Sequence, residues 1–205
     1  MKDKKEITRE VNRKKIIQAA ENVFANYGFK GATTEQIAKQ AGLPKANLHY
    51  YFKTKTILYR EVLEGILEEW MVAAQTFDKY DEPKIALTRY IEAKMHFSRT
   101  RADASKVWAN EVIQGATSVS EFLETTLKKW LENRVKVIYG WIADGKIEPV
   151  DPRALFYMIW SMTQHYADFE RQIAILNHGK RHTNDEFKQQ TEQVVHLILK
   201  SVGLN

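Results

Sequence analysis

Residues 32–55 read ATTEQIAKQAGLPKANLHYYFKTK, and this stretch carries the clearest structural signals in the chain. Thr33 and Gln36 make a capping-box pattern, which predicts the start of a helix. The apolar residues between 37 and 41 give that helix one buried face, and Gly42 is a natural C-terminal stop. After a turn of about three residues, a second short helix is predicted over 45–52. Two short helices joined by a glycine-containing turn are typical of a helix-turn-helix.

The second of these helices is too short to be stable alone, so its neighbours must hold it. Leu48 is expected to pack behind the pair, together with Tyr51 or Phe52. The polar residues of the same helix are then left to face outward. The alternative is that the aromatic residues form core and the polar ones are merely solvated.

The outward side chains suit contacts to DNA. Asn47 can pair with an adenine edge, Lys45 can reach a guanine edge or a phosphate, and the small Ala46 permits close approach to a groove. Other residues can bind phosphates and position the helix without reading sequence. The candidates for this second role are His49, Tyr50, Lys55, Thr33 and Thr34. Arg13 and Lys14 could bind the flanking DNA backbone.

Charge is unevenly distributed along the chain. Residues 1–60 hold 13 Lys and Arg against 5 Asp and Glu, whereas the remaining residues are slightly acidic. A basic segment of this kind favours a polyanionic partner, and the alternative is a solvated basic tail.

The rest of the chain also shows helical periodicity, so an all-α fold is predicted. Few prolines and glycines interrupt it, and no run alternates long enough to predict a strand. Thr54 is placed to cap a long helix that joins the N-terminal segment to the body. Further helices are predicted over 12–27, 55–77, 83–98, 102–114, 118–143, 151–174 and 184–202, with loops that include 78–83.

Several classes of protein are excluded. The chain has no cysteine, which rules out disulfides and thiolate chemistry and fits the cytoplasm. The N-terminus lacks an apolar stretch like that of a secretory signal, and the near-apolar run 154–162 is too short to span a membrane. His178 and His182 lie in a loop without a nearby metal-ligand pattern. Because no catalytic or cofactor motif is present, we expect no enzyme activity, no metal and no cofactor.

Residues 14–63 closely resemble the DNA-binding domain of the TetR family of transcriptional regulators. The matching marks are the Tyr27-Gly28-Phe29 turn, Thr33-Thr34, Ile37-Ala38, Ala41-Gly42 and Tyr51-Phe52 followed by Lys53 and Lys55. Pro44 departs from the family, which often has a serine cap there, so that capping hydrogen bond should be lost. The resemblance implies a DNA-binding domain over 1–54, with a flexible basic arm of about ten residues, and a helical effector-binding and dimerisation domain over 55–205.

The resemblance further implies a homodimer, in many cases a repressor, that reads a palindromic double-stranded operator. Two C-terminal helices could form a four-helix bundle across a two-fold axis. The candidate interface residues on them are Leu155, Met158, Met162, Val194, Val195 and Ile198. The alternative is that these residues simply close the core of the monomer.

The body resembles the subgroup of TetR regulators that control pyrimidine utilisation, most densely over residues 139–169. This implies uracil or thymine as a small-molecule effector. Trp160 could stack on the flat ring, and Gln164, one turn later, could pair with its imide edge. Trp70, Trp108, Asn110 and Glu111 could complete the pocket. The alternatives are that these residues are core, and that the protein is a helical DNA-binding or interaction protein without an effector.

Overall fold

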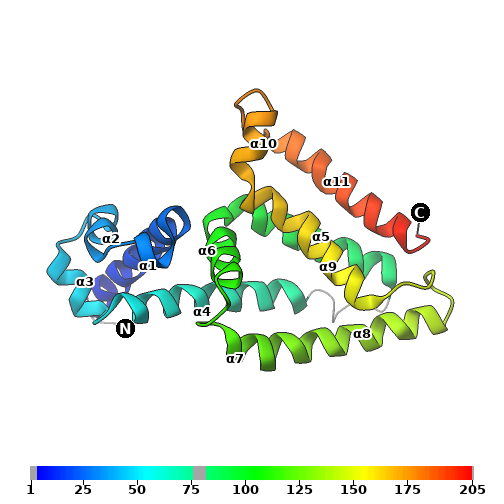
Figure 1. The fold of residues 1–205 in the computed structure, drawn as a ribbon, viewed down its shortest axis with the longest axis horizontal. Coiled ribbons are helices and arrows are strands. Elements are labelled where there is room, and N and C mark those ends of the chain that lie inside the picture. Colours follow the sequence, from blue (N-terminus) through cyan, green and yellow to red (C-terminus); the bar gives the residue numbers. More distant parts are fainter. Residues whose placement is uncertain (1–3, 76–81, 205) are drawn as a thin grey trace.

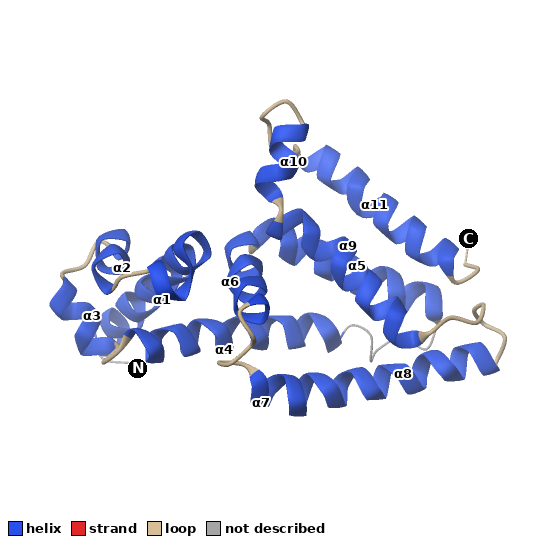
Figure 2. Ribbon diagram, in the orientation of Figure 1, coloured by secondary structure: helices blue, strands red, loops and turns tan. Residues whose placement is uncertain are grey.

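The structure, a computed structural model, describes residues 4–75 and 82–204, and these residues form helices and no strand (Figure 2). The all-α prediction is therefore confirmed. The elements are α1 (Lys4–Gly31), α2 (Thr34–Ala41), α3 (Lys45–Tyr51), α4 (Lys55–Ala74), α5 (Pro83–Thr100), α6 (Ala102–Ile113), α7 (Ser120–Phe122), the π-helix η2 (Leu123–Leu127), α8 (Lys128–Ala143), α9 (Pro152–Asp168), α10 (Glu170–Leu176) and α11 (Asn184–Ser201).

Helices α1 to α3 form a small head at one end of the molecule, and α4 runs from it into the body (Figure 1). The predicted capping box is present at the start of α2. The main-chain N–H of Thr33 donates to Gln36 Oε1 over 2.8 Å, and the N–H of Gln36 donates to Thr33 Oγ1 over 3.2 Å. Gly42 adopts the left-handed conformation, with φ 67°, that ends the helix and turns the chain.

Helix α3 has no side-chain cap, because Pro44 stands at its N-cap position. Its seven residues are held instead by packing, since Leu48 and Phe52 are both fully buried in the head. The predicted loss of the capping hydrogen bond is thus confirmed, and the position of α3 depends on its tertiary contacts.

The first helix is longer than predicted. It begins at Lys4 rather than near residue 12, so residues 4–10, where an arm was predicted, are helical; residues 1–3 lie outside the described residues. Gly28, with φ 65°, kinks the helix near its end. Tyr27, the last residue of the helix predicted over 12–27, is 59% exposed and lies outside the core.

The helix predicted over 151–174 is two helices. The backbone leaves helical geometry at Phe169, and α10 turns away from α9 (Figure 1). The carboxylate of Asp168 accepts a hydrogen bond of 2.6 Å from Ser105 on α6, which holds the end of α9 in place. The predicted helix end at residue 77 and most of the loop over 78–83 lie outside the described residues.

The body is built around α5, which packs against both α9 and α11. One buried cluster joins the head to α4 and α6, and a second fills the space between α5, α8, α9 and α11. Of the helices in the described parts of the chain, none is long and apolar enough to cross a membrane.

Arg101 ties the head to the body. Its guanidinium donates to Glu21 of α1 over 2.7 Å and also pairs with the carboxylate of Glu69 on α4. A second contact lies close by, since Asn22 of α1 donates to the carboxylate of Asp103 over 2.9 Å. The end of α5 and the start of α6 therefore meet α1 and α4 at one polar junction.

Candidate DNA interface and effector site

The outward face of α3 carries polar side chains that take no part in the core. Lys45, Ala46, Asn47 and His49 are exposed, and Tyr50 is 71% exposed. Burial of Leu48 fixes this orientation, because the remaining residues of so short a helix then point to solvent. The face is exposed as the sequence predicts, and its contact with DNA stays a prediction.

Thr33 and Thr34 lie at the N-terminus of α2, where main-chain N–H groups are available to an anion. The Thr33 hydroxyl is already used, since it accepts from Gln36 and lies 3.0 Å from Gln36 Oε1. A phosphate contact at this end would therefore rest on the main chain more than on that hydroxyl. This role also stays a prediction.

Three of the predicted phosphate ligands have partners or positions that the sequence did not indicate. The Lys55 ammonium donates to the carbonyls of Phe29 and Ala32 over 2.7 and 2.8 Å. Arg13 pairs with Glu61 of α4. Lys14 lines the groove between head and body, which also includes Arg101 and Asp103.

Arg9 is a candidate that sequence reasoning missed. Its guanidinium lies 5.9 Å from the centre of the Tyr50 ring, which places a cation beside the outward face of α3. Arg9 and Arg13 are four residues apart on α1, so helical spacing extended toward the N-terminus would have indicated it.

The residues predicted for the effector are distributed over two buried clusters. Trp70 and Trp108 pack edge to face, with ring centres 5.1 Å apart, in the cluster shared by head and body. Trp160 belongs to the other cluster, beside Trp130 and Phe156. Its indole N–H donates to the Tyr90 hydroxyl over 2.8 Å, so that donor already has a partner.

Two further members of the set are corrected by the structure. Glu111 is buried, but its carboxylate accepts from the Tyr59 hydroxyl over 2.9 Å and from the Ser118 N–H over 2.6 Å. Burial and this carboxylate raise the pKa of Tyr59, so the phenol stays protonated as the donor. Asn110 is exposed on α6. Glu111 therefore has two partners within the protein, and Asn110 lies at the surface.

Lys94 is a buried cation that sequence reasoning missed. It is 7% exposed, and its ammonium lies 4.2 Å from the centre of the Trp70 ring. Burial lowers the pKa of Lys94 to about 8, against an opposing effect of the Asp168 carboxylate. A signal was present in the sequence, because Lys94 falls on the apolar face of α5 between Ile91 and Met95.

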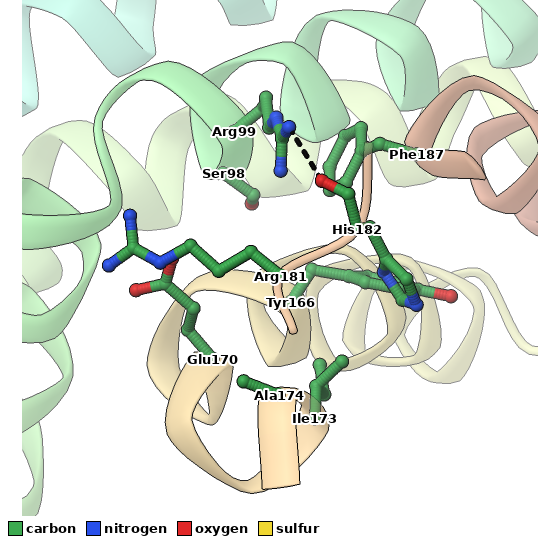
Figure 3. Close-up of a pocket in the computed structure, with 9 residues that line it drawn as sticks. All are labelled: Ser98, Arg99, Tyr166, Glu170, Ile173, Ala174, Arg181, His182 and Phe187. Carbon is green, nitrogen blue, oxygen red and sulfur yellow. Dashed lines mark hydrogen bonds and ion pairs between the residues drawn. The ribbon is translucent and has the colours of Figure 1, made fainter. Parts of the chain in front are cut away.

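A pocket of about 220 Å³ lies between α5, α9, α10 and the chain that leads into α11 (Figure 3). Its charged groups are mostly paired with one another. Arg181 contacts Glu170 over 2.9 Å, and Arg99 donates to the His182 carbonyl over 2.8 Å. None of the predicted effector residues lines this pocket, and across the described residues no cluster of His, Asp or Glu could hold a metal ion.

Half of the predicted dimer residues are unavailable to a partner. Leu155, Val194 and Ile198 are at most 3% exposed, because they face the core of their own protomer. Met158 is 45% exposed, while Met162 and Val195 are half-buried. Helices α9 to α11 expose other apolar side chains, namely Tyr157, Phe169, Ile175, Leu176 and Leu197.

Comparison with known proteins divides the chain in two. A family model described as "Bacterial regulatory proteins, tetR family" matches residues 16–62, and one described as "YcdC-like protein, C-terminal region" matches residues 63–205. The chain is 36% identical to the HTH-type transcriptional regulator RutR of Escherichia coli K12 over 190 residues, which cover 93% of this chain and 90% of that protein.

Two solved structures share the fold. The ketosteroid transcriptional regulator KstR2 of Mycobacterium tuberculosis superposes with a TM-score of 0.77 at 19% identity, covering 93% of this chain and 94% of that one. The transcriptional regulator FadR of Bacillus subtilis, in complex with stearoyl-CoA, superposes with a TM-score of 0.64 at 20% identity, covering 90% and 96%.

Proposed function

Because the chain belongs to the TetR family of bacterial regulatory proteins and is a helix-turn-helix transcription regulator, we propose that it is a repressor that binds a palindromic operator as a homodimer. A small planar metabolite, a pyrimidine base or a close relative, changes its affinity for that operator. In this proposal residues 1–54 bind DNA, residues 55–205 bind the effector and dimerise, and the protein works in the cytoplasm.

The observation that carries the proposal is the outward face of α3. A helix of seven residues is buried through Leu48 and Phe52, while its polar residues from Lys45 to Asn47 face solvent. This arrangement presents a rigid polar surface of the size that enters a major groove. Two copies of the head would read two half-sites spaced by about one helical turn, roughly 34 Å, or a modest multiple of it.

The effector part of the proposal rests on the relatives and on the body. RutR matches this chain across nearly its full length, and FadR, which shares the fold, was solved in complex with stearoyl-CoA. Gln164 is half-buried, and within the described residues its amide makes no hydrogen bond. An amide of this kind can donate to and accept from an imide edge.

The dimer part is supported by the exposed apolar side chains of α9 to α11. Met158, Tyr157 and Leu197 are 45 to 53% exposed on the two longest of these helices. Apolar residues gathered on neighbouring elements favour a contact with another protein surface. A second copy related by a two-fold axis would cover the same residues on both protomers.

The proposal is tested by a gel shift with the DNA upstream of the protein's own gene. We expect a retarded band that uracil or thymine weakens or strengthens. Replacing Asn47 by Ala should weaken specific binding by about 1–3 kcal/mol if the amide contacts a base edge. Asn26→Ala is the matched control, because Asn26 is an exposed amide that lines the groove toward the body.

Two outcomes would contradict parts of the proposal. A specific shift that neither base alters would identify a DNA-binding regulator with another effector or with none. No shift on any DNA, with the protein folded and dimeric, would favour a helical interaction protein instead.

A further inference from the structure

Lys94 lies on the face of α5 that packs against α9. One turn before it, Tyr90 accepts the indole N–H of Trp160 over 2.8 Å. One turn after it, the Ser98 hydroxyl donates to the main-chain carbonyl of Thr163 over 2.8 Å. Lys94 therefore lies between two fixed contacts, opposite the part of α9 that runs from Trp160 to Thr163.

Two hydrogen-bond donors meet at this point without an acceptor. Within the described residues the Lys94 ammonium makes no hydrogen bond, and it rests over the face of the Trp70 ring. The indole N–H of Trp70 is also buried and has no partner. The nearby carboxylate of Asp168 is already hydrogen-bonded to Ser105 over 2.6 Å and acts on Lys94 only through space.

Such a pair is unusual in a folded protein, where buried donors nearly always have acceptors. A buried ammonium is compensated by an anion or by several acceptors. The ring of Trp70 supplies part of that compensation through its electron-rich face, but it leaves the hydrogen-bonding capacity of both groups unused. An oxygen atom that accepts hydrogen bonds from both the Lys94 ammonium and the Trp70 indole N–H would supply what is missing.

We propose that Lys94 and Trp70 form the oxygen-binding end of the effector site and take a carbonyl or carboxylate oxygen of a small planar ligand. This inference rests on the proposed function, since it assigns the part of the effector that the body recognises. Gln164, from the facing helix, would contact the remaining polar edge of the ligand. Trp160, whose N–H is held by Tyr90, would then belong to the wall of the site.

The assignment also links the ligand to the head. A ligand oxygen that takes the place of the Trp70 ring over Lys94 must move that indole, and Trp70 is carried by α4. The same helix begins at Lys55, which binds the end of α1 and so touches the head directly. Helix α4 therefore connects the ligand contact at Trp70 to the head.

Calorimetry on the full chain tests this inference, with uracil and its carboxylate derivative orotate as probes. Wild type should bind at least one of them, and the stronger probe tells whether the oxygen is a carbonyl or a carboxylate. Lys94→Met removes the cation and Trp70→Phe removes the N–H while keeping a ring. Each should bind the stronger probe about tenfold more weakly or worse, because each leaves one polar contact unmade. Lys136→Met, an exposed lysine on α8, should bind like wild type.

The outcomes separate this inference from the proposed function. If Lys94→Met, folded by circular dichroism, binds the probe like wild type, or if neither probe binds wild type, the assignment of Lys94 is overturned even where the operator shift succeeds. If the variants lose the probe but no operator is bound, the ligand site stands and the proposed regulation of DNA fails.

Discussion

The half-buried side chain of Lys55 packs against the end of the first helix, where its ammonium donates to the carbonyls of Phe29 and Ala32. It also lies 4.6 Å from the centre of the Phe29 ring. These carbonyls follow the kink at Gly28 and would otherwise lack a donor near the surface of the head. A residue that sequence reasoning places on a phosphate therefore has a structural role as well.

Replacing Lys55 by Met should destabilise the protein by about 1–3 kcal/mol, because two carbonyl oxygens lose a charged donor. Urea denaturation in the absence of DNA measures this directly. Lys53→Met is the control, since Lys53 is exposed and adjacent in sequence. An unchanged free energy of unfolding for Lys55→Met would contradict this structural role.

Lys94 makes a pH-dependent contribution to stability whose sign follows from its pKa. Burial lowers that pKa to about 8 from its usual 10.5. Below pH 8 both folded and unfolded chains carry the proton, and the folded state bears the full penalty of a buried charge. Between about pH 8 and 10.5 Lys94 is protonated more fully in the unfolded chain than in the folded chain. The contribution of Lys94 to stability therefore rises with pH in that range.

The comparison of wild type with Lys94→Met isolates this effect from the titration of tyrosines. At pH 7 we expect the variant to be more stable than wild type, because methionine fills the site without a charge. That advantage should shrink by about 1.4 kcal/mol per pH unit above pH 8. Urea denaturation at pH 7, 9 and 10 measures it, and an advantage that stays constant would place the pKa of Lys94 outside this range.

At the scale of residues, the sequence predicts which side chains are buried better than it predicts their hydrogen-bond partners. The 3-and-4 spacing correctly placed Leu48 and Phe52 inside and Asn47 outside, because periodicity reports which side of a helix faces the core. It did not reveal that Glu111 would accept from Tyr59, 52 residues earlier in the chain. Such contacts depend on how helices cross, which a local pattern does not contain.

Among the elements, the junction of α5 and α6 controls how the head meets the body. Arg101 reaches Glu21 on α1 and Glu69 on α4 at once. Burial raises the pKa of Glu21, while Arg101 acts in the opposite direction and favours the ionised carboxylate. The junction therefore depends on one guanidinium that serves two helices.

Replacing Arg101 by Ala should lower the free energy of unfolding by about 1–3 kcal/mol, because Glu21 is left in a partly buried position without its donor. The matched control is Arg89→Ala on the adjoining helix α5, because the pair of Arg89 with Glu92 at 3.3 Å is exposed and should contribute less than about 1 kcal/mol. Equal effects of the two substitutions in thermal or urea unfolding would remove the junction's special role.

Helix boundaries show the limits of prediction at this scale. The start of α2 and its capping box were predictable, since Thr33 and Gln36 carry the signal in four consecutive residues. The break at Phe169 was not, because no proline or glycine marks it and the tie between Asp168 and Ser105 joins residues 63 apart. Trp70 and Trp160 were grouped by their chemistry, and no local pattern could indicate that they pack into two different buried clusters, on α4 and on α9.

For the whole molecule, the proposed dimer has its interface on the exposed apolar side chains of α9 to α11. An aspartate at Met158, or at Leu197, should weaken the dimer, because a charge would be buried in an apolar contact. Size-exclusion chromatography with light scattering measures the mass. Tyr139→Asp is the control, since Tyr139 is 53% exposed on α8. A dimer that survives both substitutions would place the interface elsewhere.

The missing cap at Pro44 has a consequence for how new specificities could arise. Helix α3 has no side-chain cap and is held by the burial of Leu48 and Phe52. The exposed side chains at 45 to 47 therefore contribute little to the stability of the fold. Exposed substitutions of this kind usually change stability by no more than about 0.5 kcal/mol. The head can therefore sample many different residues at these positions while remaining folded, which makes it a suitable scaffold for selecting regulators of altered operator preference.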